Sequence, residues 1–232
     1  MPMSHALTHV DRVSLLAVDL DNTLINRDAA FRSAAAAFLA EQGLPAEDVE
    51  VIMDLDGSGH VHRPVVVAAL AERWEGVVSP EAIAGFLRRG PAAHVALEEP
   101  VRRALLAVRA AGVPCVIVTN GYTGQQEEKI RNAGLDTLVD GWVISESVGS
   151  RKPDPGIFHA AASAAGLPAL DRASTWMIGD AGHTDVRGAI DLGLPSVWVS
   201  GGRPWAETSF RPTHIAVDVV EAIAHVLGEC SL

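Results

Sequence analysis

Five side chains in three separate segments could together do phosphoryl chemistry. Asp19 and Asp21 stand two residues apart, Lys152 lies between arginine and proline, and Asp180 and Asp185 follow further along. Four carboxylates within a few ångströms repel one another unless a cation joins them. Oxygen donors without histidine or cysteine favour a hard cation such as Mg²⁺. A divalent ion beside a lysine is suited to a phosphoryl group.

A fourth segment of interest reads Thr119-Asn120-Gly121. A hydroxyl group and free backbone N–H groups at this point suit the oxygens of a phosphate. The combined pattern therefore predicts a phosphate site that also holds a metal.

Most of these segments follow apolar runs that are typical of buried parallel strands. We expect strands within residues 14–20, 114–121, 174–182 and 195–202, with a weaker candidate at 140–145. The carboxyl ends of such strands share one sheet edge, where ligands bind. The chemical segments should therefore meet there.

Helical patterns separate the strands, which predicts a three-layer α/β fold with a doubly wound parallel sheet. We expect these helices within residues 101–112, 124–135, 155–168 and 183–195.

Residues 27–96 interrupt this alternation with four helical patterns and no strand. The patterns cover residues 27–45, 45–57, 63–74 and 79–89. We therefore predict a catalytic core of residues 1–26 and 97–232, and a small helical domain of residues 27–96 inserted after the first strand.

The insertion contains one acidic turn, residues 54–59, that begins like a calcium loop. Position twelve of such a loop needs an acid, and here it is Val65, so calcium binding is not expected. Gly59 instead permits an unusual backbone angle. His60, His62 and Arg63 follow and are candidates for substrate contacts, with a solvated helix entry as the alternative.

The motifs DLDNT, TNG, RKPDP and GDAGHTD resemble, in order, the four motifs of the haloacid dehalogenase (HAD) superfamily. The insertion resembles the C1 cap of its subfamily I. The resemblance implies that Asp19 is a nucleophile that becomes an aspartyl phosphate. It implies that Asp21 is the general acid/base, a role that calls for a raised pKa.

The same resemblance gives roles to the other residues. Thr119 and the Asn120 backbone match the phosphoryl-binding pair, and Lys152 matches the cation that holds nucleophile and phosphoryl group. Asp180 matches a Mg²⁺ ligand, together with Asp19 and the backbone carbonyl of Asp21. Asp185 matches a residue that supports Lys152 or water near the metal, and Thr23 one that orders the turn.

The expected activity is Mg²⁺-dependent hydrolysis of a small phosphate monoester. A phosphoglucomutase-type phosphotransferase would keep Asp21 and stays open. A 2-haloacid dehalogenase is less favoured, because such enzymes lack the second acid. A non-catalytic phosphate-sensing module is the alternative from another class.

Composition excludes several other classes. The chain has 232 residues and a net charge of −11, from 18 basic and 29 acidic side chains, which disfavours nucleic-acid binding. No apolar run approaches the roughly 18–20 residues of a membrane helix, and residues 1–12 do not resemble a signal peptide. Cys115 and Cys230 are too few for a disulfide framework, so a cytoplasmic location is expected. The substrate and the oligomeric state stay open.

Overall fold

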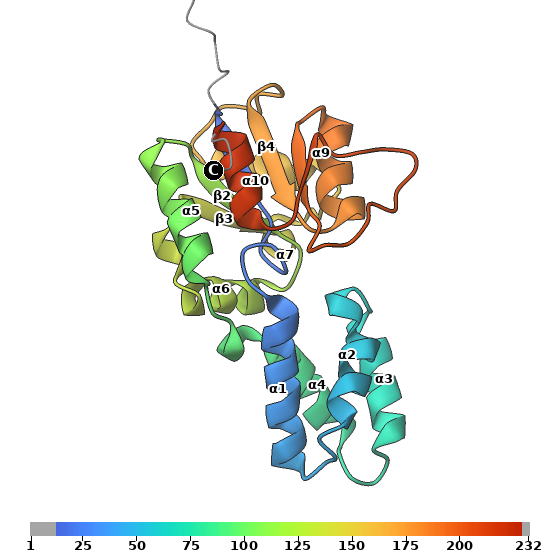
Figure 1. Cartoon of the computed structure of the whole chain (residues 1–232). Helices are drawn as coiled ribbons and strands as arrows, with labels where there is room; N and C mark the ends of the chain where they lie inside the picture. The colour runs from blue at the N-terminus through green and yellow to red at the C-terminus, as the bar shows by residue number, and fades with distance from the viewer. Residues whose placement is uncertain (1–12, 229–232) are drawn as a thin grey trace, which may run out of the picture.

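A computed structural model describes residues 13–228 and contains a six-stranded parallel sheet (Figure 1). The strand order is β3-β2-β1-β4-β5-β6, and every neighbouring pair is parallel. The strands are β1 (Leu15–Val18), β2 (Cys115–Thr119), β3 (Gly141–Ile144), β4 (Thr175–Gly179), β5 (Ser196–Val199) and β6 (His214–Ala216). The predicted α/β fold with a parallel sheet is confirmed.

Helices cover both faces of this sheet, because the strand side chains alternate between two apolar clusters. Leu16 and Val18 of β1 pack in one cluster with side chains of α5 (Glu99–Ala110) and α10 (Val219–Leu227). Leu15 and Ala17 pack in the other, with α8 (Pro155–Ala164) and α9 (Arg187–Leu192). This alternation produces the three expected layers.

The remaining segments of the sheet region are short. They are α6 (Thr123–Asn132), α7 (Ser145–Val148), the 3₁₀ turns η2 (Ala92–His94) and η3 (Leu135–Thr137), and the π-helical turn η4 (Gly182–Val186). Five strands lie where the sequence predicted them. The sequence analysis did not assign β6 or α10, and β6 has only three residues at the edge of the sheet.

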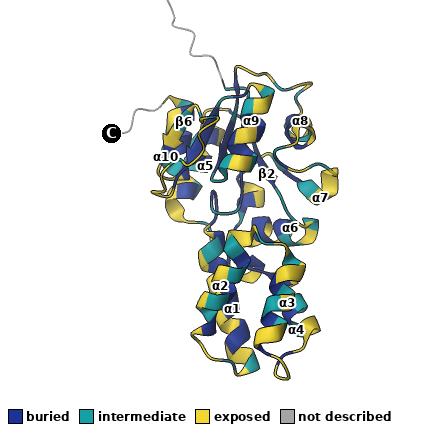
Figure 2. Cartoon of the chain, turned by 90° about the vertical axis from the view of Figure 1, so that its right-hand side faces the viewer, coloured by how far each residue is buried: buried dark blue, intermediate teal, exposed yellow. Residues whose placement is uncertain are grey.

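Four helices from residues 27–89 pack together below the sheet region in Figure 1. They are α1 (Arg27–Gln42), α2 (Asp48–Asp56), α3 (Arg63–Arg73) and α4 (Pro80–Arg89). Their inward faces form an apolar cluster of their own, visible as the dark blue interior of the lower helices in Figure 2. Within it the ring of Phe38 stacks on Phe86 at 4.5 Å. The division into a core and a cap at residues 27–96 stays a prediction.

Two buried carboxylates tie these helices together. Asp56 is fully buried and accepts hydrogen bonds from Arg27, from Arg63 at 2.6 Å and from the Gly59 backbone at 2.8 Å. Asp48 accepts from Arg73 and from the indole of Trp74. The expected turn is present as η1 (Gly57–Gly59), and Gly59 has a φ of 82°, which confirms its unusual backbone angle.

In the described part of the chain, no helix is both long and apolar enough to cross a membrane. Cys115 is buried in the sheet and carries a free thiol. Cys230 and the N-terminal segment that was compared with a signal peptide lie outside the described residues.

Candidate active site

The three central strands bring the predicted chemical residues to one edge of the sheet. Asp19 follows β1, Thr119 ends β2 and Asp180 follows β4. The sheet places β1 between β2 and β4, so their carboxyl ends are adjacent. Lys152 reaches the same edge from the segment between α7 and α8.

Lys152 lies at the centre of the site and is almost completely buried. Its ammonium group is 2.5 Å from Asp19 Oδ1, 2.7 Å from Asp185 Oδ1 and 2.6 Å from the backbone oxygen of Val118. Burial disfavours the charged form, but the Asp185 and Asp19 carboxylates outweigh it and raise the pKa of Lys152. The site therefore keeps a permanent cation beside Asp19.

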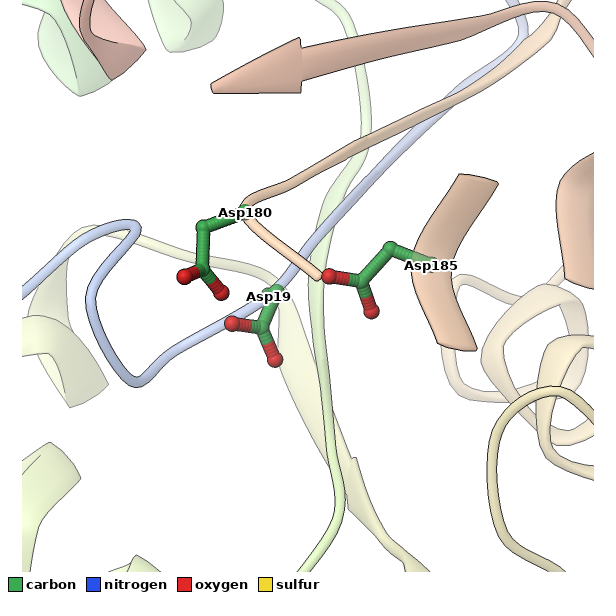
Figure 3. A group of neighbouring side chains, drawn as sticks. All are labelled: Asp19, Asp180 and Asp185. Atoms are coloured by element: carbon green, nitrogen blue, oxygen red, sulfur yellow. The ribbon is translucent and has the colours of Figure 1, made fainter. Parts of the chain in front are cut away.

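Three carboxylates converge next to this cation, as Figure 3 shows for Asp19, Asp180 and Asp185. One oxygen from each lies within 4.8 Å of the others. Burial, opposed by Lys152 and reinforced by Asp185 and Asp180, raises the pKa of Asp19 to about 8. Burial and Asp185, opposed by Arg203, raise the pKa of Asp180 to about 6. This excess of negative charge fits a divalent cation with oxygen ligands.

Close packing at the end of β4 brings Asp185 into this group. A β-carbon on Gly179 would overlap the carboxylate of Asp185, so a glycine is required there. The Asp185 carboxylate also accepts the Ala181 backbone N–H at 3.0 Å. Arg203 lies 3.2 Å from Asp180, and its side chain is more than half exposed.

Asp21 has surroundings that the sequence analysis did not foresee. Both of its carboxylate oxygens lie 2.8 Å from the ammonium of Lys129, and Gln126 donates to it at 2.9 Å. Burial alone would raise its pKa, but the charge and hydrogen bond of Lys129, with the hydrogen bond from Gln126, outweigh burial and lower it. The expectation of a raised pKa for Asp21 is therefore wrong.

Lys129 and Gln126 were missed because α6 was interpreted only as a covering helix. The sequence did contain a signal that these two residues are buried: Gln126 and Lys129 share a helix face with the apolar Ile130. Charged side chains on a buried helix face are rare unless they are paired.

The phosphate-binding segment lies against the same helix. Thr119 is buried, and its hydroxyl oxygen accepts a hydrogen bond from Gln126 at 2.6 Å. The Asn120 side chain makes two hydrogen bonds with the backbone of Lys152, at 2.9 and 3.0 Å, and so fixes the lysine segment. Thr23 donates to Asp19 Oδ2 at 3.2 Å.

A cavity of about 630 Å³ is lined by the predicted chemical residues and also reaches the inserted helices; these residues are Asp19, Asp21, Thr119, Lys152, Asp180 and Asp185. Its far side is formed by residues that follow α2: Ser58, Gly59, His60, Val61, His62 and Arg63. The rings of His60 and His183 lie 5.4 Å apart across it. The ring of Trp205 packs edge-on against that of Trp198, with 4.9 Å between the ring centroids.

Comparison with known proteins finds a matching family model and several similar phosphatases. A family model for haloacid dehalogenase-like hydrolases matches residues 13–193. Pyrimidine 5′-nucleotidase YjjG of Escherichia coli is 36% identical over 97 residues, which is 42% of each chain. The match therefore spans less than half of that relative. N-acylneuraminate-9-phosphatase of Rattus norvegicus is 28% identical over 91% of this chain and 93% of its own.

A comparison with solved structures also finds a similar fold. A magnesium-bound HAD hydrolase of Bacillus subtilis matches with a TM-score of 0.75 and 22% identity, over 93% of this chain and 99% of that structure. With the family match over most of its length, the chain belongs to the haloacid dehalogenase-like hydrolase family.

Proposed function

We propose that the protein is a Mg²⁺-dependent phosphatase that hydrolyses a small phosphate monoester through an aspartyl phosphate on Asp19. The observation that carries this proposal is the position of Lys152 between Asp19 and Asp185, with Asp180 beside them, at one wall of a cavity. A nucleophilic carboxylate, a fixed cation and spare carboxylate charge are what phosphoryl transfer to aspartate requires.

The cluster of three carboxylates, Asp19, Asp180 and Asp185, is suited to Mg²⁺. Asp19 and Asp180 would hold the ion, with the backbone carbonyl of Asp21 as the further ligand that the family resemblance implies. Asp185 belongs to the same group of oxygens but is already paired with Lys152. When bound, Mg²⁺ neutralises charge on the phosphoryl oxygens as negative charge approaches from Asp19.

The proposed reaction has two balanced steps. In the first, an oxygen of Asp19 forms a bond to phosphorus, the bond to the ester oxygen breaks, and Asp21 gives its proton to the leaving alcohol. In the second, water attacks phosphorus, its proton passes to Asp21, and phosphate leaves as the Asp19 carboxylate is restored. Lys152 and the Thr119 hydroxyl would hold the phosphoryl oxygens during both steps.

Asp21 must be protonated for the first step, although Lys129 keeps it ionised before substrate binds. A bound phosphate dianion places negative charge beside this carboxylate and favours its protonated form. The ionised form is the one that the second step needs, because it accepts a proton from water. The ion pair with Lys129 thus supports the role of Asp21 as the base.

We further propose that residues 27–96 act as a cap over the site. The segment from Ser58 to Arg63 already lines the cavity opposite Asp19, so it can contact the leaving group and exclude water. A covered cavity favours small substrates. The names of the relatives support this, since N-acylneuraminate-9-phosphatase and phosphoglycolate phosphatase are among them.

A phosphate-release screen over about a hundred phosphorylated metabolites, with Mg²⁺ and with a chelator, tests the proposal. We expect release from at least one small monoester, and loss of that release on chelation. Isomer formation without free phosphate would show a phosphotransferase instead. No turnover of any compound would contradict the proposal.

A further inference from the structure

Helix α6 carries two buried polar side chains that contact residues of the proposed reaction. Gln126 and Lys129 are three residues apart on the helix, and their relative exposures are 1% and 2%. Placing a lysine there is costly unless the charge is paired. The hydrogen bonds of its ammonium group, within the described residues, both go to Asp21.

Gln126 connects two residues of the site. Its amide nitrogen donates to Asp21 at 2.9 Å and to the Thr119 hydroxyl at 2.6 Å. An amide nitrogen has two hydrogens, so both donations can be made at once. The ionised carboxylate can only accept, which fixes the nitrogen of Gln126 on the side of Asp21.

The bond to Thr119 has a chemical consequence. Because the hydroxyl oxygen of Thr119 accepts from Gln126, its own hydrogen must donate to another group. The acceptor recorded for it is the Asn120 backbone oxygen at 3.5 Å, a long contact that a phosphoryl oxygen can replace. Thr119 faces the cavity next to Asp19, where the phosphoryl oxygens would lie. The orientation of this hydroxyl group is therefore set before substrate arrives.

We propose that Gln126 and Lys129 are positioning residues: Lys129 holds the carboxylate of Asp21 in place, and Gln126 locks Asp21 and the Thr119 hydroxyl into one arrangement. The proposal deepens the proposed phosphatase function and rests on it for the roles of Asp21 and Thr119. Both residues act through a neighbour rather than on the substrate.

Double-mutant cycles distinguish this role from simple core packing. Lys129→Met is made in the wild type and in Asp21→Asn, and Gln126→Leu in the wild type and in Thr119→Val. The kcat and KM of each are measured with p-nitrophenyl phosphate and Mg²⁺. A packing role would lower activity by the same factor in both backgrounds, whereas positioning through a neighbour loses its effect once that neighbour is replaced.

We expect Lys129→Met to lower kcat at least about 10-fold in the wild type and less than about 3-fold in Asp21→Asn. Gln126→Leu should raise KM and lower kcat, and the KM effect should disappear in Thr119→Val. Arg131→Met is the matched control, because it removes a cation from the exposed face of the same helix and should leave both constants unchanged. Equal losses in both backgrounds would overturn the proposal.

Melting temperatures check that each variant is folded. If Lys129→Met melts below the assay temperature, Lys129→Gln replaces it in the cycle, since it also removes the charge. Lys129→Arg keeps the charge and should recover most of kcat; recovery no greater than in the folded variant without the charge would count against positioning by charge.

Crystal structures of the Lys129 and Gln126 variants give a readout that does not depend on turnover. We expect the Asp21 carboxylate to rotate away from its wild-type position in each. An unmoved Asp21 in both variants would overturn the proposal even in an active enzyme. Absence of turnover in the wild type would count against the phosphatase function alone, because the structures would still decide the positioning role.

Discussion

Lys152 and Asp19 are 133 positions apart in the sequence, and their charged atoms lie 2.5 Å from each other. The contact is possible because Asp19 follows a central strand and Asn120 fixes the lysine segment beside it. Lys152 also binds Asp185, so one cation is shared between two buried carboxylates. The site therefore depends on the whole sheet.

Asp19→Asn should abolish turnover. The amide keeps the shape of the side chain but is a poor nucleophile, so we expect phosphate release to fall by more than about 10³-fold. Thermal melting should show a folded protein, because Lys152 keeps its pairing with Asp185. Residual activity within about 10-fold of the wild type would remove Asp19 from its role.

Stability of the metal-free protein should fall as pH rises through the pKa of Asp180. Its folded-state pKa is raised to about 6 from 3.8, so folding favours its protonated form. This contribution to stability is fully present below the pKa of Asp180 in the unfolded chain. It is lost as pH rises through the pKa of Asp180 in the folded protein. We predict that the melting temperature of Asp180→Asn, relative to the wild type, increases from about pH 5 to about pH 8.

The measurement is differential scanning calorimetry in the presence of a chelator. Asp191→Asn is the control, since Asp191 forms an exposed pair with Arg187 and should show no such pH-dependent gain. A constant difference between Asp180→Asn and the wild type across this range would contradict the prediction.

Mg²⁺ should bind more tightly as pH rises from about 6 to about 8, because protons on Asp19 and Asp180 compete with the ion. The pKa values of these two groups are raised to about 8 and about 6. Calorimetric titration in two buffers of different ionisation enthalpy should reveal proton release on binding, and less of it at the higher pH. Binding with no proton release at either pH would argue against this site.

The carboxylate of Asp56 should be a major source of stability for the inserted helices. It is fully buried and accepts from Arg27, Arg63 and the Gly59 backbone. We expect Asp56→Asn to lower the free energy of unfolding by about 3–5 kcal/mol, because two arginines lose their partner. Denaturant unfolding measures this loss.

A matched surface pair provides the control for Asp56. Arg32 and Glu50 also join α1 to α2, but their side chains are 47% and 64% exposed. Glu50→Gln should therefore lower the free energy of unfolding far less than Asp56→Asn does, because solvent screens an exposed ion pair. Equal losses of unfolding free energy in Asp56→Asn and Glu50→Gln would show that burial does not determine how much the Asp56 carboxylate stabilises the protein.

The sequence was sufficient to predict the sheet edge that forms the site. Each buried strand is an apolar run that ends in polar residues, so Asp19, Thr119 and Asp180 could be placed from local pattern alone. β6 escaped prediction because only three residues pair there, and its Ile215 is 43% exposed. An edge strand of this kind has no apolar run to recognise.

The partner of Asp21 could not be predicted in the same way. Lys129 is 108 positions away, and its contact depends on how α6 docks over the loop after β1. Local pattern shows that Gln126 and Lys129 share a helix face, but not which carboxylate that face meets. The pKa of Asp21 was therefore expected to rise, whereas tertiary packing lowers it.

The most direct test of the account is a search for the phosphoryl group on Asp19 itself. Asp21→Asn protein, mixed with Mg²⁺ and a substrate from the screen, is quenched in acid, digested and analysed by mass spectrometry. Because the intermediate should break down slowly, one phosphoryl group should remain on the peptide that contains Asp19. The double variant with Asp19→Asn and Asp21→Asn should carry none. Phosphate release with that peptide unmodified, or a phosphoryl group on another residue, would contradict the account.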